Sequence, residues 1–195
     1  MRHGSETEIK LPVPNLAAAR RKIHSLGFVK IIPRHFESNT LYDFRDCRLR
    51  TSRCVLRIRH AQRQWLLTFK GPPVATLHYK SREEIETLVE DGEQLQAILE
   101  GVGLQKAFRY DKYRTVFAQK TPNRRARGAQ LVLDETPVGN YLELEGPEAW
   151  IDRTAERLGY RCADYITASY AALYRNHCEA RGRAPADMVF KTRGD

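Results

Sequence analysis

The feature that most constrains this chain is a period-two alternation of charged and uncharged side chains that recurs in separate segments. The first segment is Ser5–Lys10, which reads S-E-T-E-I-K. An extended backbone places its Glu6, Glu8 and Lys10 on one face and the intervening side chains on the other. Taken alone, such a segment is typical of a solvated edge strand. Whether the pattern recurs therefore decides its meaning.

The same alternation appears in at least six further segments. Their charged positions are Arg57 and Arg59; Lys70; Arg82, Glu84 and Glu86; Lys112 and Arg114; Asp134; and Glu143 and Glu145. An open sheet with one face in water would show this pattern at no cost. Solvated faces usually mix in Thr, Ser and Gln, however, whereas these faces hold seven acids and seven bases. The opposite faces are apolar and need helices to cover them, so the core would lie outside the sheet.

The order of the predicted elements indicates an α+β fold built on an antiparallel sheet that closes on itself. The expected strands are residues 5–10, 28–32, 35–42, 54–60, 65–70, 77–86, 108–119, 129–135 and 140–145. The expected helices are 16–26, 91–100 with Asp91 as N-cap, 147–158 opened by Pro147 and ended by Gly159, and 166–178. Loops are expected at 45–53 and at the basic turn 120–127.

Length and composition predict a single domain at residues 1–178 with a basic tail at 179–195. No apolar run approaches the roughly 20 residues that cross a bilayer, and no signal peptide is recognised, so we expect a cytoplasmic protein and no membrane partner. The four cysteines form no C-x-x-C pair and are expected to be free. Signatures of a P-loop, a dinucleotide fold or a serine triad are absent.

The net charge of +9 predicts a polyanionic partner, either nucleic acid or a small polyphosphate. Much of the excess lies in residues 45–53, in residues 120–127 and after His177, where runs of charge are usually solvated surface. No nucleic-acid reading module is recognisable. A nucleic-acid partner is therefore disfavoured.

A closed sheet with its charged faces inward would hold two kinds of site. Clustered carboxylates are hard oxygen ligands suited to Mg²⁺ or Mn²⁺. Guanidinium and ammonium groups bind phosphate oxygens. A complex of a divalent metal with a triphosphate satisfies both sets, whereas an empty interior would confine many charges at a high cost.

These residues resemble the CYTH superfamily, the triphosphate tunnel metalloenzymes. E-T-E-I-K matches the family's E-x-E-x-K signature, and further matches follow in the family's order. They are L-R-I-R at 56–59, L-T-F-K-G-P at 67–72, R-E-E-I-E at 82–86, K-Y-R at 112–114, L-D-E at 133–135 and G-N-Y-L-E-L-E-G at 139–146. The last phrase and S-Y at 169–170 are most similar to the bacterial class IV adenylyl cyclase-like subgroup.

The resemblance implies an eight-stranded antiparallel tunnel that binds a triphosphate with Mg²⁺ or Mn²⁺. It implies metal binding by Glu6, Glu8, Glu84, Asp134, Glu143 and Glu145, and phosphate binding by Lys10, Arg57, Arg59, Lys70, Arg82, Lys112 and Arg114. Direct roles in catalysis are expected for Glu6, Glu8, Lys10 and Asp134. The expected partners are a triphosphate such as ATP or tripolyphosphate and a second copy of the chain in a homodimer.

Two reactions remain open at this point. Attack by water would make the protein a triphosphatase, and attack by the ribose 3′-hydroxyl of ATP would make it an adenylyl cyclase. We favour hydrolysis, because it needs no pocket for a base and none is recognisable.

Thiamine triphosphate is disfavoured, because no lysine lies between Lys120 and Lys191 to match one on the C-terminal helix of thiamine triphosphatases. A non-catalytic polyphosphate- or RNA-binding module would keep the basic side chains but would not need the acidic ones, so the presence of Glu6, Glu8, Asp134, Glu143 and Glu145 argues against it. Trp65, Trp150 and Tyr170 are expected to serve in packing.

Overall fold

The computed structural model describes residues 2–75, 78–120 and 128–191. The described strands are β1 (Arg2–Pro12), β2 (Phe28–Phe44), β3 (Val55–Ala61), β4 (Gln64–Lys70), β5 (Val74–Ala75), β6 (Lys80–Val89), β7 (Leu104–Gln119), β8 (Gln130–Thr136) and β9 (Gly139–Glu145). They run in the order β1-β9-β8-β7-β2-β3-β4-β6, and β6 pairs again with β1. Every one of these pairings is antiparallel, so eight of the described strands close into a barrel, as the sequence predicts.

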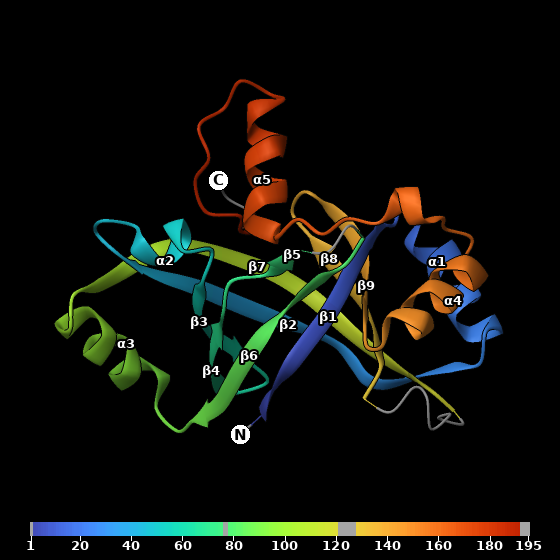
Figure 1. The fold of residues 1–195 in the computed structure, drawn as a ribbon, viewed down its shortest axis with the longest axis horizontal. Helices are drawn as coiled ribbons and strands as arrows, with labels where there is room; N and C mark the ends of the chain where they lie inside the picture. Colours follow the sequence, from blue (N-terminus) through green and yellow to red (C-terminus); the bar gives the residue numbers. More distant parts are fainter. Residues whose placement is uncertain (1, 76–77, 121–127, 192–195) are drawn as a thin grey trace.

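The described helices lie outside this barrel (Figure 1). They are α1 (Leu16–Ser25), α2 (Arg48–Thr51), α3 (Gly92–Gly101), α4 (Glu148–Leu158) and α5 (Tyr170–Glu179). In the figure α1 and α4 lie together on one side, α3 lies at the opposite end, and α5 projects from the barrel. All of the described helices are too short or too polar to cross a membrane.

The largest hydrophobic core lies between the outer face of the barrel and helices α1 and α4. Ile9, Leu133 and Leu144 on the strands are fully buried there against Trp150 and Ile151 of α4. Truncating one such leucine to alanine costs about 2–5 kcal/mol of stability. A smaller cluster lies at α3, where Tyr42, Ile58 and Leu104 are buried. Because the apolar faces point outward to the helices, the charged faces point into the barrel.

The helix ends follow the predicted capping residues. The side chain of Asn15 accepts a hydrogen bond from the Ala18 amide at the start of α1. Asp91 accepts from the amides of Glu93 and Gln94 at the start of α3, as predicted. Pro147 precedes α4, and Gly159 follows it with a φ of 98°, which glycine adopts without strain.

Two predictions about the first half of the chain were wrong. Residues 28–44 form one strand rather than two, because the pairing with β7 continues across register shifts between Lys30 and Ile32 and between Ile32 and His35. The expected loop at residues 45–53 contains α2. Here the Asp43 carboxylate accepts hydrogen bonds from the amides of Leu49 and Arg50 and so fixes the turn.

The second half also needs correction. The strand expected at 77–86 runs from Lys80 to Val89 and pairs to its end with β4; Leu77 itself lies outside the described residues. The last helix begins at Tyr170 rather than Ile166, because Ile166 exchanges two backbone hydrogen bonds with Lys10 and Ser169 caps the helix. Residues 121–127 of the predicted basic turn and 192–195 of the tail lie outside the described residues as well.

Candidate functional site in a charged tunnel

A cavity of about 560 Å³ runs inside the barrel. Thirteen of the fourteen charged residues singled out by the alternation line it, the exception being Asp134, which lies behind the lining. The thirteen are Glu6, Glu8, Lys10, Arg57, Arg59, Lys70, Arg82, Glu84, Glu86, Lys112, Arg114, Glu143 and Glu145. The inward orientation of the charged faces is therefore confirmed, and the cavity is called the tunnel below.

One half of the tunnel carries an acidic wall, formed by Glu6 and Glu8 on β1, Glu84 on β6 and Glu145 on β9. Lys70 of β4 contacts Glu6 and lies 2.9 Å from an oxygen of Glu84. Burial, together with repulsion from Glu8 and Glu84, raises the pKa of Glu6. Burial and the same neighbours, with Glu6, raise the pKa of Glu145 to about 7. Carboxylate charge is thus only partly compensated on this wall.

Glu8 is the member of the acidic wall that is well compensated. Lys80 Nζ lies 2.8 Å and Lys10 Nζ 3.4 Å from its Oε1. Burial alone would raise the pKa of Glu8, but these two lysines hold it well below its ordinary value. Lys10 also lies 3.3 Å from Glu143, so a chain of alternating charges leads away from the acidic wall. Lys80 was not among the site residues predicted from the sequence.

The other half carries a basic wall, formed by Arg57 and Arg59 on β3 and Lys112 and Arg114 on β7. Glu37 of β2 lies among them and is only 2% exposed. Its Oε2 is 3.5 Å from both Arg59 and Lys112. Burial alone would raise the pKa of Glu37, but the positive charges of Arg59 and Lys112 hold it well below its ordinary value. The sequence analysis missed Glu37, although it shares the parity of the inward positions on its strand.

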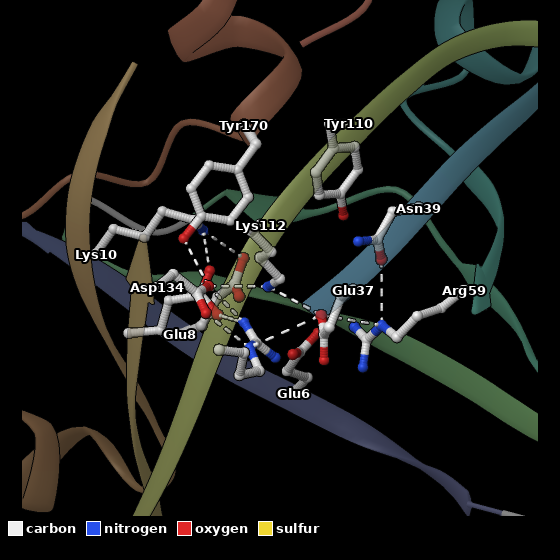
Figure 2. A network of polar contacts seen from close by, with 12 residues as sticks. Glu6, Glu8, Lys10, Glu37, Asn39, Arg59, Tyr110, Lys112, Asp134 and Tyr170 are labelled. Carbon is white, nitrogen blue, oxygen red and sulfur yellow. Dashed lines mark hydrogen bonds and ion pairs between the residues drawn. The ribbon is translucent and has the colours of Figure 1, made fainter. Parts of the chain in front are cut away.

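The basic wall holds more positive charge than Glu37 compensates. Burial and repulsion from Arg57 lower the pKa of Arg59. Arg59 donates to the Asn39 side-chain oxygen at 3.1 Å, while the Asn39 amide nitrogen is buried without a partner. Arg57 donates to the hydroxyls of Thr68 and Tyr110. Arg57 also lies 3.4 Å from an oxygen of Glu86, so the uncompensated positive charge of this wall lies chiefly on Arg59, whose contacts with Glu37 and Asn39 are drawn in Figure 2.

Asp134 anchors the basic wall from behind the lining. It accepts from Lys112 at 2.8 Å, from two nitrogens of Arg114 at 2.7 and 2.8 Å, and from the Tyr170 hydroxyl at 2.8 Å. With no exposed surface, its oxygens face these donors rather than the tunnel. Tyr170, expected to serve in packing alone, lines the tunnel and donates into this network, and Figure 2 shows its hydroxyl directed at Asp134.

Arg82 lies where the tunnel meets a second cavity of about 1140 Å³. It is buried, and none of the described acidic side chains lies within ion-pair distance of it. The second cavity is lined by apolar and aromatic side chains, among them Leu41, Phe108 and Tyr174, and by charged side chains of both signs. This cavity adjoins the tunnel, and no such pocket was recognisable from the sequence.

The acidic wall fits a hard divalent cation. Among the described residues, no three His, Cys, Asp or Glu side chains are close enough together to form a ready-made metal site. Mg²⁺ needs no such cage, because it is usually held by one or two carboxylates together with waters and substrate phosphates. The pKa values of Glu6, despite its contact with Lys70, and of Glu145 are raised by burial and by the neighbouring carboxylates, so the negative charge here is not fully balanced by positive charge. A bound cation would supply it.

Comparisons with known proteins agree with the fold. A family model described as "CYTH domain" matches residues 4–159. A Methanocaldococcus jannaschii protein named "putative adenylate cyclase" is 28% identical over 141 residues, which cover 72% of this chain and 75% of that protein.

Solved structures are also similar. A Vibrio parahaemolyticus protein named in the same way has a TM-score of 0.70 and 20% identity, covering 85% of this chain and 94% of its own. A second solved structure is that of a Hippeastrum protein named "putative adenylyl cyclase", which is described as revealing a dominant triphosphatase activity. It has a TM-score of 0.62 and 21% identity, and the match covers 92% of this chain and 97% of that protein. At these identities the likeness shows the fold.

Proposed function

Because the chain belongs to the CYTH domain family, we propose that it is a metal-dependent enzyme that hydrolyses the triphosphate of a small molecule inside the tunnel. The observation that carries this proposal is the pairing of an incompletely compensated acidic wall with an incompletely compensated basic wall in one cavity. A triphosphate with a divalent cation presents both of the complementary charges. A neutral ligand would leave both walls unbalanced.

The basic wall binds the phosphate oxygens in this proposal. Arg57, Arg59, Lys112 and Arg114 supply charge-assisted donors, as do Lys10, Lys70 and Arg82 elsewhere in the lining. Asp134 keeps Lys112 and Arg114 in place, so we assign it a positioning role instead of metal binding.

Glu6, Glu8 and Glu84 of the acidic wall would hold Mg²⁺ or Mn²⁺, with Glu143 beside them. A cation held there would supply positive charge to the phosphate oxygens and a binding position for water. Glu145 has no ion-pair partner among the described residues, and its pKa of about 7 suits a group that accepts a proton near neutral pH. We assign Glu145 the proton that leaves the attacking water.

The transition state of the reaction spreads negative charge over the transferred phosphoryl group. Cationic side chains that are already fixed by Glu37 and Asp134 stabilise that charge without having to reorganise. Catalysis is therefore a matter of orientation and electrostatics rather than of a covalent intermediate with the protein.

The test is to incubate the purified protein with tripolyphosphate, ATP or thiamine triphosphate, each with Mg²⁺ or with Mn²⁺, and to identify the products. Hydrolysis releases orthophosphate and leaves pyrophosphate, ADP or thiamine diphosphate. No turnover of any of the three, with tight binding of tripolyphosphate, would refute the enzymatic proposal and favour a binding module. Turnover without added metal in the presence of a chelator would refute the metal requirement.

The second candidate function is adenylyl cyclisation, and the cavity next to Arg82 favours it. A cavity with aromatic and aliphatic lining can take the nucleoside of ATP while the phosphates occupy the tunnel. The ribose 3′-hydroxyl would then attack the α-phosphorus, and pyrophosphate would leave. Cyclic AMP among the products of the ATP reaction would establish this activity, whereas ADP and orthophosphate alone would exclude it under those conditions.

A further inference from the structure

The C-terminal segment supplies a missing piece of the barrel wall. β8 pairs with β7 only along Tyr113–Phe117, so no described strand of the barrel covers the same edge of β7 before that point. Met188 covers it: its amide donates to the Arg109 carbonyl at 2.9 Å, and its carbonyl accepts from the Asp111 amide at 2.9 Å. The Asp187 carboxylate accepts from the Arg109 amide at 2.8 Å. We call Asp187–Phe190 the C-terminal strap.

The strap and α5 hold each other in place. Met188 is 1% exposed and packs with Tyr110 of β7 and Tyr170 of α5 in one buried cluster. The Tyr174 hydroxyl donates to the Asp187 carbonyl at 3.2 Å. The ring of Phe190 lies 5.2 Å from that of Tyr113. In Figure 1 the chain leaves α5, turns, and returns toward the barrel.

Two tyrosines carry this packing into the tunnel. The rings of Tyr110 and Tyr170 are 5.8 Å apart. The Tyr110 hydroxyl accepts from Arg57 at 3.4 Å, and the Tyr170 hydroxyl donates to Asp134 at 2.8 Å. The Tyr170 ring also lies 5.2 Å from each of the Lys10 and Lys112 ammonium nitrogens. Both tyrosines line the tunnel (Figure 2).

We infer that α5 and the C-terminal strap act together as a clamp that positions the phosphate-binding side chains, with Tyr170 as its positioning residue in the tunnel. Both parts lie outside residues 4–159, which the family model matches. The physical reason is competition for Asp134. When the Tyr170 hydroxyl is lost, Asp134 holds Lys112 and Arg114 more closely, and those cations become less available to phosphate. The inference rests on the proposed function.

The first test is Tyr170→Phe, which removes one oxygen and keeps the ring. The probe is a triphosphate analogue with methylene bridges, titrated with Mg²⁺ into the full-length protein by calorimetry. We expect its Kd to rise about tenfold, the worth of a hydrogen bond to a charged group. KM should rise by a similar factor while kcat changes little. Tyr160→Phe is the matched control, because the Tyr160 hydroxyl donates to the Pro12 carbonyl away from the tunnel.

The second test is Met188→Ala, alone and combined with Tyr170→Phe. If Met188 acts through Tyr170, the single change raises Kd by a few fold and the double variant loses less affinity than the two single losses combined. Val102→Ala, at an exposed apolar position, is the control. If Met188→Ala fails to fold, Tyr170→Phe decides the matter alone. Wild-type affinity in Tyr170→Phe, or independent effects in the double variant, would overturn the clamp. A wild-type protein that binds no analogue would refute the proposed function itself.

Discussion

The acidic wall and the basic wall of the tunnel are built by the same alternation of strand residues, yet their charges are compensated to different degrees. On the acidic wall, Glu145 lacks an ion-pair partner among the described residues and titrates near pH 7. On the basic wall, Glu37 and Asp134 bind several cations each, and the surplus remains on Arg59. We infer from this difference that the ligand of the tunnel is indicated by the side chains whose charge is not balanced by a neighbour, rather than by the total charge of the lining.

Removing a carboxylate from the acidic wall should have the largest effect. In Glu8→Gln, a cation-binding oxygen is lost and Lys10 and Lys80 lose their shared partner. We expect metal-dependent turnover of tripolyphosphate to fall by about a hundredfold or more. The far-ultraviolet circular dichroism spectrum, which reports the secondary structure, should stay unchanged. Glu156→Gln on the exposed face of α4 is the control. Unchanged turnover in Glu8→Gln would show that the acidic wall does not serve the cation.

Removing a cation from the basic wall should act on binding instead. Arg59→Gln keeps a hydrogen-bond donor near Asn39 but removes the charge that is least compensated. We expect KM for tripolyphosphate to rise about tenfold with a smaller change in kcat. The control is Arg153→Gln, an exposed position on α4. An unaltered KM would place the phosphates elsewhere in the tunnel.

The smallest effect concerns stability in the absence of metal. The pKa of Glu145 is about 7 in the folded chain and near 4.5 as an unperturbed carboxyl, so the wild type is fully stable with respect to this group below about pH 4.5 and loses stability as the pH rises from there through 7. Glu145→Gln resembles the protonated form. Its Tm should exceed that of the wild type by about 2–4 °C at pH 8, and the difference should fall toward zero at about pH 4, below the unperturbed pKa. A Tm difference that is the same at both pH values would contradict the uncompensated charge on the acidic wall.

Strand periodicity predicted most of the tunnel, because a closed barrel turns a period of two directly into inside and outside. Glu37 and Lys80 carried the same signal: Glu37 has the parity of Asn39, and Lys80 has that of Arg82. The signal was weaker on β2, where the inward positions also include an amide and a leucine. Tyr170 could not be predicted in this way. Its place in the tunnel depends on how the chain crosses from α4 to α5, which strand periodicity does not encode.

The location of the main core has a consequence for how such a protein can change. Because Leu133, Leu144 and Trp150 pack on the outside of the barrel, the hydrophobic packing of the fold and the chemistry of the tunnel depend on different sets of side chains. Exchange of a tunnel residue alters charge without opening a void in the core, whereas Leu144→Ala should weaken the fold and leave KM near its original value. A lineage built on this plan can acquire new substrates through lining substitutions while its outer packing stays the same.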